Sequence, residues 1–195
     1  MNQIPDQISD KETQVIIREL SMVTSSGVIG DVVEFGCYLG ATSIRISRVL
    51  MNRNDREFYV YDSFEGLPEK GMNDSSPLGN QFKAGELLAT KKQLIKNITQ
   101  AKVRMPCIKK AWFNELTHDD LPEKIAFAFL DGDYYDSIKT SLKLIEKNLV
   151  QGAVIVVHDY SNPSLPGVSR AVDEWLKIHP AKMKLEQTLA VICLR

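Results

Sequence analysis

The sequence predicts an α/β fold: a doubly wound, mostly parallel sheet of about seven strands with helices on both faces. Short apolar runs rich in β-branched and aromatic residues alternate with longer segments whose apolar residues recur every three or four positions. The clearest runs also end in an acidic residue or a glycine. Because strand and helix patterns alternate along the chain, parallel strands joined by crossover helices are the arrangement expected.

The strands differ in the strength of their signal. A weaker strand is expected within KVRMPCIKK (102–110). The segment KMKLEQTLAVICLR predicts a closing hairpin, whose last strand (189–194) is antiparallel because no helix follows to return the chain. Four strong strands are expected: DVVEFG (31–36), FYVYD (58–62), IAFAFLD (125–131) and AVIVVHD (153–159).

Helical spacing of apolar residues fills the intervals between these strands. The expected helices are 12–24, 42–51, 85–100, 137–148 and 169–178. The segment EKGMNDSSPLGNQFKAG (69–85) is dense in Gly, Pro, Asn, Asp and Ser, which predicts a long mobile loop, either a lid or a surface excursion. We expect one domain over 1–195, with an N-terminal helical segment at 1–29.

Composition excludes several classes of protein. The 195 residues are 44% hydrophobic and 25% charged, with a formal net charge of -1, which offers no field for nucleic acid or anionic lipid. The first residues, MNQIPDQISD, lack a basic and apolar leader, and no run is long enough to span a membrane. Cys37, Cys107 and Cys193 form no CxxC pair. We therefore expect a cytoplasmic protein with reduced thiols.

Acidic residues at the strand ends predict a polar cleft. Ligands of open α/β sheets bind outside the carboxyl ends of the strands, so Glu34, Asp62, Asp131 and Asp159 are expected to meet at one edge. The stretch AFLDGDYYDS adds Asp133 and Asp136. Because buried carboxylates need compensation, this cluster indicates a cation, a ligand or a solvent-filled cleft. Asp136 precedes an expected helix and is interpreted as its cap or dipole partner.

The segment EFGCYLGATS predicts a tight turn between the first strand and its helix. Gly36 and Gly40 allow close backbone approach, and the helix N-terminus can receive an anionic group, although a purely structural turn explains the same glycines. The spacing lacks the third glycine of a dinucleotide fingerprint, which argues against a nicotinamide dehydrogenase. Asp62, at the end of the next strand, is placed to accept hydrogen bonds from a ribose diol or to form an Asx turn.

Six segments together resemble the macrocin O-methyltransferase (TylF) family. They are VEFGCYLGATS, YDSFEGLP, KAWFNEL, AFLDGDYYDSIKTSL, GAVIVVHDY and PGVSRAVDEWL, in the order and spacing of that family, and they span residues 30–176. The resemblance implies a class I S-adenosylmethionine-dependent methyltransferase with a Rossmann-like sheet and a divalent metal. In the best-known members of the family the acceptor is a sugar hydroxyl of a natural product.

The resemblance also implies a cofactor site. Glu34 is expected to orient the glycine turn by accepting backbone N–H groups rather than to touch the ligand. Trp112 belongs to a segment that flanks the adenine, but we expect it to pack in the core rather than to make a specific contact. Each residue would approach one part of the cofactor. They are Gly36, Tyr38, Gly40 and Thr42 for the methionine, Asp62 for the ribose, Ser63 and Phe64 for the adenosine, and Ala111, Trp112 and Phe113 for the adenine. Asp131 is also counted among the cofactor-binding residues.

The metal position is where this chain departs from the family. The resemblance implies ligands at Asp131, His158 and Asp159, with Asp133 as general base. Oxygen ligands suit Mg²⁺, whereas the imidazole of His158 favours Mn²⁺, Fe²⁺ or Zn²⁺. His158 is otherwise an uncoordinated histidine at the rim, or the base if no metal binds.

Two other functions remain open from the sequence. One is a different metal-dependent reaction on the same fold, such as hydroxylation with Fe²⁺, which His158 would suit. The other is a binding module that holds S-adenosylmethionine without turnover. The expected acceptor is a small molecule with a hydroxyl group, covered by the 69–85 loop or by a partner subunit in a homo-oligomer.

Overall fold

A seven-stranded sheet forms the centre of the computed structural model, which describes residues 4–5, 7–53, 55–78 and 82–194. The strand order is β3-β2-β1-β4-β5-β7-β6. The first five strands are parallel, and β7 runs antiparallel to both β5 and β6. The strands are β1 (Asp31–Phe35), β2 (Phe58–Asp62), β3 (Cys107–Lys110), β4 (Ile125–Leu130), β5 (Leu149–Val157), β6 (Lys182–Glu186) and β7 (Leu189–Cys193). The predicted fold class is confirmed.

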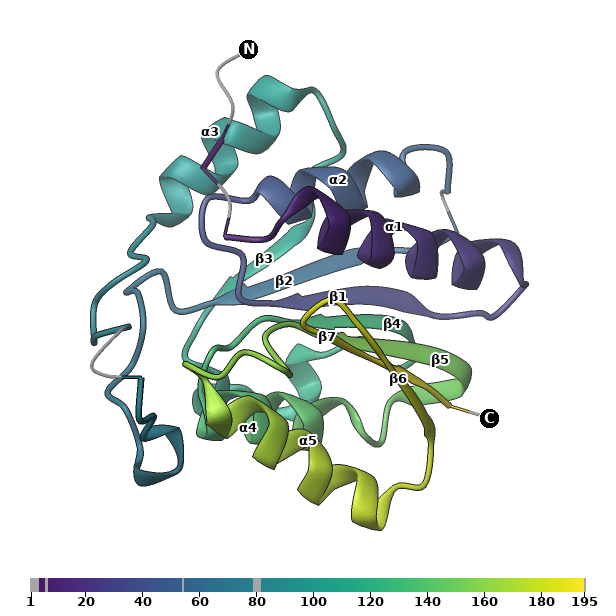
Figure 1. Cartoon of the computed structure of the whole chain (residues 1–195). Helices are drawn as coiled ribbons and strands as arrows, with labels where there is room; N and C mark the ends of the chain where they lie inside the picture. The colour runs from purple at the N-terminus through teal and green to yellow at the C-terminus, as the bar shows by residue number, and fades with distance from the viewer. Residues whose placement is uncertain (1–3, 6, 54, 79–81, 195) are drawn as a thin grey trace.

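Helices cover both faces of this sheet (Figure 1). One face carries α1 (Asp10–Ser25), α2 (Ala41–Leu50) and α3 (Lys91–Ala101), and the other carries α4 (Tyr135–Ile145) and α5 (Pro166–Ile178). Among the described residues no helix is both long and apolar enough to cross a lipid bilayer.

Two hydrophobic layers hold the helices on the sheet. Alternate side chains of β4 point to opposite faces: Phe127 and Phe129 join the layer under α1, α2 and α3, whereas Ala128 and Leu130 join the layer under α4 and α5. All six residues of β4 are buried. Each fully buried large apolar side chain contributes roughly 1.5–3 kcal/mol, so this central strand anchors the edge at which ligands bind.

Several element boundaries differ from the predicted ones. The helix expected from residue 85 begins at Lys91, because Thr90 and Gln93 form a capping box there and Leu87 has a φ of 58° that a helix cannot contain. The first helix begins at Asp10, after a capping box between Ser9 and Glu12. The last two helices also begin earlier than expected, α4 at residue 135 and α5 at 166.

The segment 69–85 is tied to the body of the molecule over part of its length. It contains the 3₁₀ turn η1 (Met72–Asp74). Asp74 accepts a hydrogen bond from the Tyr135 backbone N–H at 2.7 Å, and Arg170 donates to the Asn73 side chain at 2.6 Å. Residues 79–81 of the expected lid lie outside the described residues, so the lid stays a prediction.

Candidate active site

The carboxyl ends of β1, β2, β4 and β5 open into a cavity of about 560 Å³. The strand order reverses between β1 and β4, which is where open α/β sheets bind their ligands. The predicted convergence of acidic strand ends is therefore confirmed. The predicted site residues that line this cavity are Glu34, Gly36, Tyr38, Thr42, Asp62, Ser63, Trp112, Phe113, Asp131, Asp133, His158 and Asp159.

Three predicted site residues do not line the cavity. A Cβ at Gly40 would lie 2.3 Å from Leu94 Cδ1, so this glycine is needed for packing against α3. The Phe64 side chain is 6% exposed and belongs to the apolar layer under α1, α2 and α3. Ala111 packs against the opposite layer. The cofactor contacts predicted for Gly40, Phe64 and Ala111 stay predictions, and the packing of the three residues leaves their backbone as the part that could make them.

The turn after β1 is held against two neighbouring strands. Gly36 has a φ of 85°, and its N–H donates to the Tyr61 carbonyl at 2.9 Å. A Cβ on Gly36 would lie 2.0 Å from the Asp131 carbonyl oxygen, so only glycine fits. The turn is thereby fixed at the floor of the cavity.

Asp62 organises the loops that follow β1 and β2. Its Oδ2 accepts a hydrogen bond from the Cys37 backbone N–H at 2.8 Å, and its Oδ1 accepts one from the Phe64 N–H at 2.7 Å. The Asx turn considered for this residue is thus formed. Burial, reinforced by the Asp62 carboxylate, raises the pKa of the Cys37 thiol, which stays protonated at neutral pH. Asp62 also lines the cavity, and its role toward a ribose remains a prediction.

Glu34 connects β1 to the helix that follows the turn. It is fully buried and accepts a hydrogen bond from the Ser43 hydroxyl, in α2, at 2.5 Å. Its predicted role was to orient the turn, and the contact with Ser43 fixes the start of α2 relative to the strand. Glu34 also lines the cavity.

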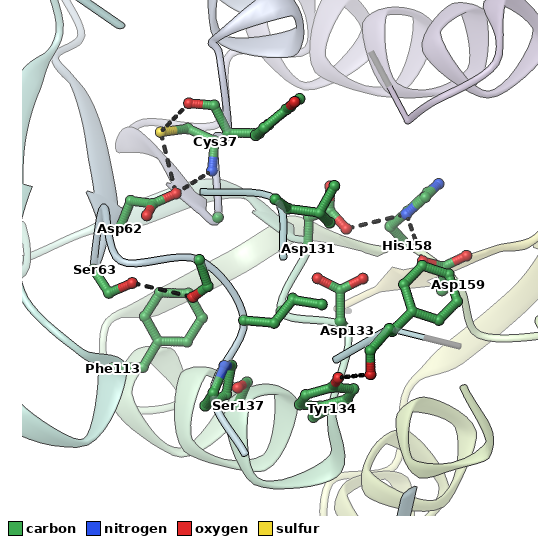
Figure 2. A pocket seen from close by; sticks show the side chains of 18 of the residues that line it. Cys37, Asp62, Ser63, Phe113, Asp131, Asp133, Tyr134, Ser137, His158 and Asp159 are labelled. Atoms are coloured by element: carbon green, nitrogen blue, oxygen red, sulfur yellow. Dashed lines mark hydrogen bonds and ion pairs between the residues drawn. The ribbon is translucent and has the colours of Figure 1, made fainter. Parts of the chain in front are cut away.

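Asp131, His158 and Asp159 form a compact group after β4 and β5 (Figure 2). One potential ligand atom from each lies within 4.8 Å of the others. His158 Nδ1 is 3.0 Å from Asp131 Oδ1 and 3.0 Å from Asp159 Oδ2. Backbone hydrogen bonds fix both strand ends: Asp131 N–H donates to the Phe35 carbonyl and His158 N–H to the Leu130 carbonyl. Two carboxylates and an imidazole at this spacing can hold a divalent cation.

The electrostatics of this group are dominated by its negative charge. Burial lowers the pKa of His158, but Asp131, Asp159 and Glu12 outweigh that effect and hold it well above its ordinary value. Asp133 lies beside them, as Figure 2 shows, and faces the same space. Burial, together with the charges of Asp131 and Asp159, raises the pKa of Asp133 well above its usual range.

Glu12 is a neighbour of this group that the sequence did not reveal. It lies in the first turn of α1, and its Oε1 is 3.8 Å from His158 Nε2. Ser9 donates to the same carboxylate through its N–H and its hydroxyl, at 2.9 and 2.6 Å, and the Thr188 hydroxyl donates to Oε1. The Ser9-x-x-Glu12 pattern signals a helix start, but no local pattern could place Glu12 behind His158.

Loops and helix starts complete the wall of the cavity, and they too carry acidic groups. The predicted capping role of Asp136 required it to precede α4, but Asp136 is the second residue of that helix. It lies in the first turn, where a carboxylate complements the helix dipole, as the other predicted role required. Asp74 takes the capping position toward Tyr135. The remaining acidic lining residues are Glu69 and Glu115, and further lining residues include Pro5, Gln7, Ile8, Ser137, Thr140 and Asn162.

Backbone strain is concentrated at this edge of the sheet. Four residues other than glycine have a positive φ in the loops after β1, β2, β4 and β5: Tyr38 (46°), Phe64 (56°), Asp133 (59°) and Asp159 (59°). Such conformations cost free energy and gather at binding sites, where the surrounding structure enforces them. The conformations of the four loops are therefore set by their position around the cavity rather than by the backbone preferences of their own residues.

Comparisons with known proteins show which family the chain resembles. The macrocin-O-methyltransferase (TylF) family matches residues 8–192. The 8-demethyl-8-(2,3-dimethoxy-alpha-L-rhamnosyl)-tetracenomycin-C 4'-O-methyltransferase of Streptomyces olivaceus is 30% identical over 147 residues, which are 71% of this chain and 56% of that protein. The demethyldecarbamoylnovobiocin O-methyltransferase of Streptomyces niveus is 25% identical over 78% of this chain and 60% of its own length. The chain thus spans about three fifths of the length of these curated relatives.

Solved structures show the same fold. The O-methyltransferase NovP superposes with a TM-score of 0.86 at 21% identity, over 98% of this chain and 83% of that one. An O-methyltransferase from Bacillus cereus, solved in complex with SAH, gives a TM-score of 0.66 at 13% identity, over 100% of this chain and 85% of that one.

Proposed function

The chain belongs to the macrocin O-methyltransferase (TylF) family, and we propose that it transfers a methyl group from S-adenosylmethionine to a hydroxyl of a small molecule. The observation that carries this proposal is the joint placement, in one cavity, of the Gly36 turn, Asp62 and the Asp131–His158–Asp159 group. The name of the S. olivaceus relative specifies a rhamnosyl group. We take the acceptor to be a sugar hydroxyl of a natural-product intermediate.

The donor would lie along the loops after β1 and β2. The N-terminus of α2 directs backbone N–H groups toward the turn at Gly36–Thr42, which suits the carboxylate of the methionine part. Asp62 has the position to accept hydrogen bonds from the ribose. Trp112 and Phe113 line the cavity where an adenine can stack on an aromatic side chain.

A divalent cation fits the residues that follow β4 and β5. Asp131 and Asp159 offer oxygen donors and His158 an imidazole nitrogen, so Mg²⁺, Mn²⁺ and Fe²⁺ are all compatible with the donor set. When bound, the cation supplies positive charge that lowers the pKa of a nearby hydroxyl. Asp131, His158 and Asp159 would hold it.

Asp133 is the proposed general base. Its carboxylate faces the same space as the cation ligands, and burial together with the charges of Asp131 and Asp159 raises its pKa, which makes the ionised carboxylate a stronger base than that of a free aspartate. Asp133 would accept the proton as the acceptor oxygen attacks the methyl group. If no cation binds, His158 is the alternative base.

The acceptor would lie against two segments that line the cavity beside the strand ends. Glu69, Gly71 and Asp74 line it from the segment 69–78, and Pro5, Gln7 and Ile8 line it from the chain before α1. We propose that the described parts of the expected lid, 69–78 and 82–85, cover the acceptor, with a partner subunit as a further cover. Cys37, Cys107 and Cys193 are free thiols, which supports action in the cytoplasm, and the net charge of -1 supports a small-molecule acceptor rather than nucleic acid.

Titration calorimetry with S-adenosylhomocysteine tests the donor site. We expect a micromolar Kd, about -8 kcal/mol, which Asp62→Ala weakens strongly. Asp119→Ala, at an exposed position away from the cavity, is the matched control. Because Asp62 also holds two backbone N–H groups, unfolding curves accompany the titration, and Trp112→Ala serves as a second variant.

The outcomes of this experiment separate the rival functions. Absence of any binding of S-adenosylhomocysteine to the folded wild-type chain would refute the methyltransferase. Binding without methyl transfer to any of a panel of glycosides would leave a non-catalytic binding module. Metal analysis that finds stoichiometric iron, with turnover that consumes oxygen, would favour a hydroxylase.

A further inference from the structure

We infer that Glu12 is a positioning residue for the cation site: it holds the His158 ring so that Nδ1 faces Asp131 and Asp159, and thereby favours metals that accept an imidazole ligand. This inference rests on the cation site proposed above. It concerns a residue of α1, far in sequence from the ligands.

The two ring nitrogens of His158 face different partners. Nδ1 is 3.0 Å from both Asp131 Oδ1 and Asp159 Oδ2, whereas Nε2 faces Glu12 Oε1 at 3.8 Å. His158 is 5% exposed and Glu12 6% exposed, so water competes little for either group. The ring therefore lies between the cation site on one side and a single carboxylate on the other.

Metal binding by an imidazole depends on the partner of its second ring nitrogen. A neutral ring binds a metal through the lone pair of one nitrogen and carries its proton on the other. Metal-binding histidines almost always direct that remaining N–H toward a carboxylate, a carbonyl or water, and loss of this partner typically weakens metal binding by about 10–100-fold. Glu12 is a buried carboxylate in that position. At 3.8 Å the contact is an electrostatic one, longer than a hydrogen bond.

Glu12 is itself held in place by groups that do not touch the cation site. Ser9 donates twice to its carboxylate, and Thr188, in the turn between β6 and β7, donates to Oε1. The carboxylate is thus fixed by the start of α1 and by the closing hairpin. A residue held in this way can fix the orientation of the ring that it faces.

The expected consequence is a preference among metals. With His158 the three ligands supply two carboxylates and an imidazole, a set that suits Mn²⁺ and Fe²⁺ better than a purely oxygen set does. Loss of the Glu12 charge should therefore weaken Mn²⁺ more than Mg²⁺, because Mg²⁺ depends less on the imidazole.

The test measures metal binding by calorimetry, without donor or acceptor, in wild type and Glu12→Gln. Glutamine keeps the size and an acceptor oxygen for the two Ser9 donors, and its amide NH2 can donate to the Thr188 hydroxyl, so the helix start is preserved. We expect Mn²⁺ to bind about 10–100-fold more weakly in E12Q and Mg²⁺ to change less. Pulsed EPR of bound Mn²⁺ should show nitrogen coupling from His158 in wild type, reduced in E12Q.

Two controls separate positioning from a merely structural role. Thr188→Val removes one of the groups that hold Glu12 but keeps the Glu12 charge and both Ser9 contacts, so it should change the ratio of Mn²⁺ to Mg²⁺ affinity less than E12Q does, even if stability falls. In an His158→Asp background, E12Q should no longer change that ratio, since the ring on which Glu12 acts is gone.

Several results would overturn the inference. They are unchanged Mn²⁺ affinity and nitrogen coupling in E12Q, an equal effect of T188V, an equal effect of E12Q in the His158→Asp background, or no metal binding by the wild type. Each of these leaves the proposed methyltransferase intact as long as S-adenosylhomocysteine still binds, so the two failures are distinguishable.

Discussion

Gly36 passes so close to Asp131 that a Cβ on the glycine would lie 2.0 Å from the aspartate's carbonyl oxygen. The two residues follow the neighbouring strands β1 and β4, at the point where the strand order reverses. This approach brings the glycine turn and the first acidic residue of the proposed cation site into direct contact. The proposed donor site and the proposed cation site therefore share the backbone of these two residues as a common wall.

Gly36→Ala should destabilise the fold and abolish binding of S-adenosylhomocysteine. Alanine must adopt a φ of 85°, which costs roughly 1–2 kcal/mol, and its methyl group also collides with backbone that cannot rotate away. Gly27→Ala is the matched control, since Gly27 has a φ of 79° with no atom within 4 Å of its added Cβ. Urea denaturation should show a larger decrease in the free energy of unfolding for G36A than for G27A. Equal losses would mean that the contact with Asp131 relaxes.

Asp133→Asn should remove methyl transfer without removing the donor. Asparagine keeps the shape and tolerates a positive φ, but it cannot accept the proton of the acceptor hydroxyl. We expect kcat to fall about 10²–10⁴-fold, with the Kd of S-adenosylhomocysteine within about threefold of wild type. Asp136→Asn, another acidic position on the cavity wall, is the control. A similar loss in D136N would assign the effect to the overall charge of the cavity.

Asp74 should make the stability of the protein depend on pH. Burial raises the pKa of Asp74, and the negative charge of Asp136 raises it further. Hydrogen bonds from the Tyr135 and Gly71 N–H groups and the positive charge of Lys70 offset part of this increase. The folded state therefore holds this proton more tightly than the unfolded state, whose aspartates titrate near about 3.9. Protonated Asp74 therefore contributes to the free energy of unfolding at acidic pH, and this contribution is lost as the pH rises from about 3.9 through the pKa of Asp74 in the folded state.

The variant Asp74→Asn isolates this effect, because asparagine stays neutral and keeps an acceptor for the Tyr135 N–H. The free energy of unfolding of wild type, minus that of D74N, should decrease as pH rises from acid toward neutrality. Urea denaturation at a series of pH values measures this difference, with Asp119→Asn, at an exposed position, as the control substitution of the same kind. A difference that grows with pH would contradict the raised pKa.

The charge of the cavity should select against anionic acceptors. Its described lining contains nine carboxylates and no lysine or arginine, and Lys70 lies further out, 6.0 Å from the centroid of the Tyr134 ring. A phosphate on the acceptor would meet this negative field. We expect kcat/KM for a glycoside linked to a nucleoside diphosphate to be at least about tenfold below that of the neutral glycoside, or ~1.4 kcal/mol.

A variant on the wall tests the cause of that selection. Glu69→Gln removes one charge from the lining of the cavity and should narrow the difference between the two acceptors. Preference of the wild type for the phosphorylated acceptor would contradict the electrostatic argument.

The sequence was sufficient for the strands and for the acidic edge. Alternating apolar runs predicted β1, β2, β4 and β5, and their last residues were enough to place Glu34, Asp62, Asp131 and Asp159 together, because parallel strands end on one side of a sheet. The strands could be predicted because their apolar runs are local patterns. The common edge followed from a general rule about parallel sheets rather than from any contact special to this chain.

The sequence was not sufficient where a distant segment decides the outcome. Helix α4 begins at Tyr135 because Asp74, sixty-one positions earlier, accepts its N–H. Phe64 follows Asp62 closely, yet its positive φ directs the side chain into the core and away from the cavity. Glu12 reaches His158 only after α1 has packed on the sheet. Contacts of this kind are set by tertiary packing and leave no local pattern.

At the four loop residues with a positive φ, stability and ligand binding make opposite demands on the backbone. Asp133 and Asp159 tolerate that conformation comparatively well, but Tyr38 and Phe64 carry bulky side chains in a region that aromatic residues seldom occupy. Glycine at either aromatic position would relieve strain and also loosen the loop. A collection of variants selected only for heat resistance should therefore drift toward glycine at these sites and lose affinity for the donor as it does so.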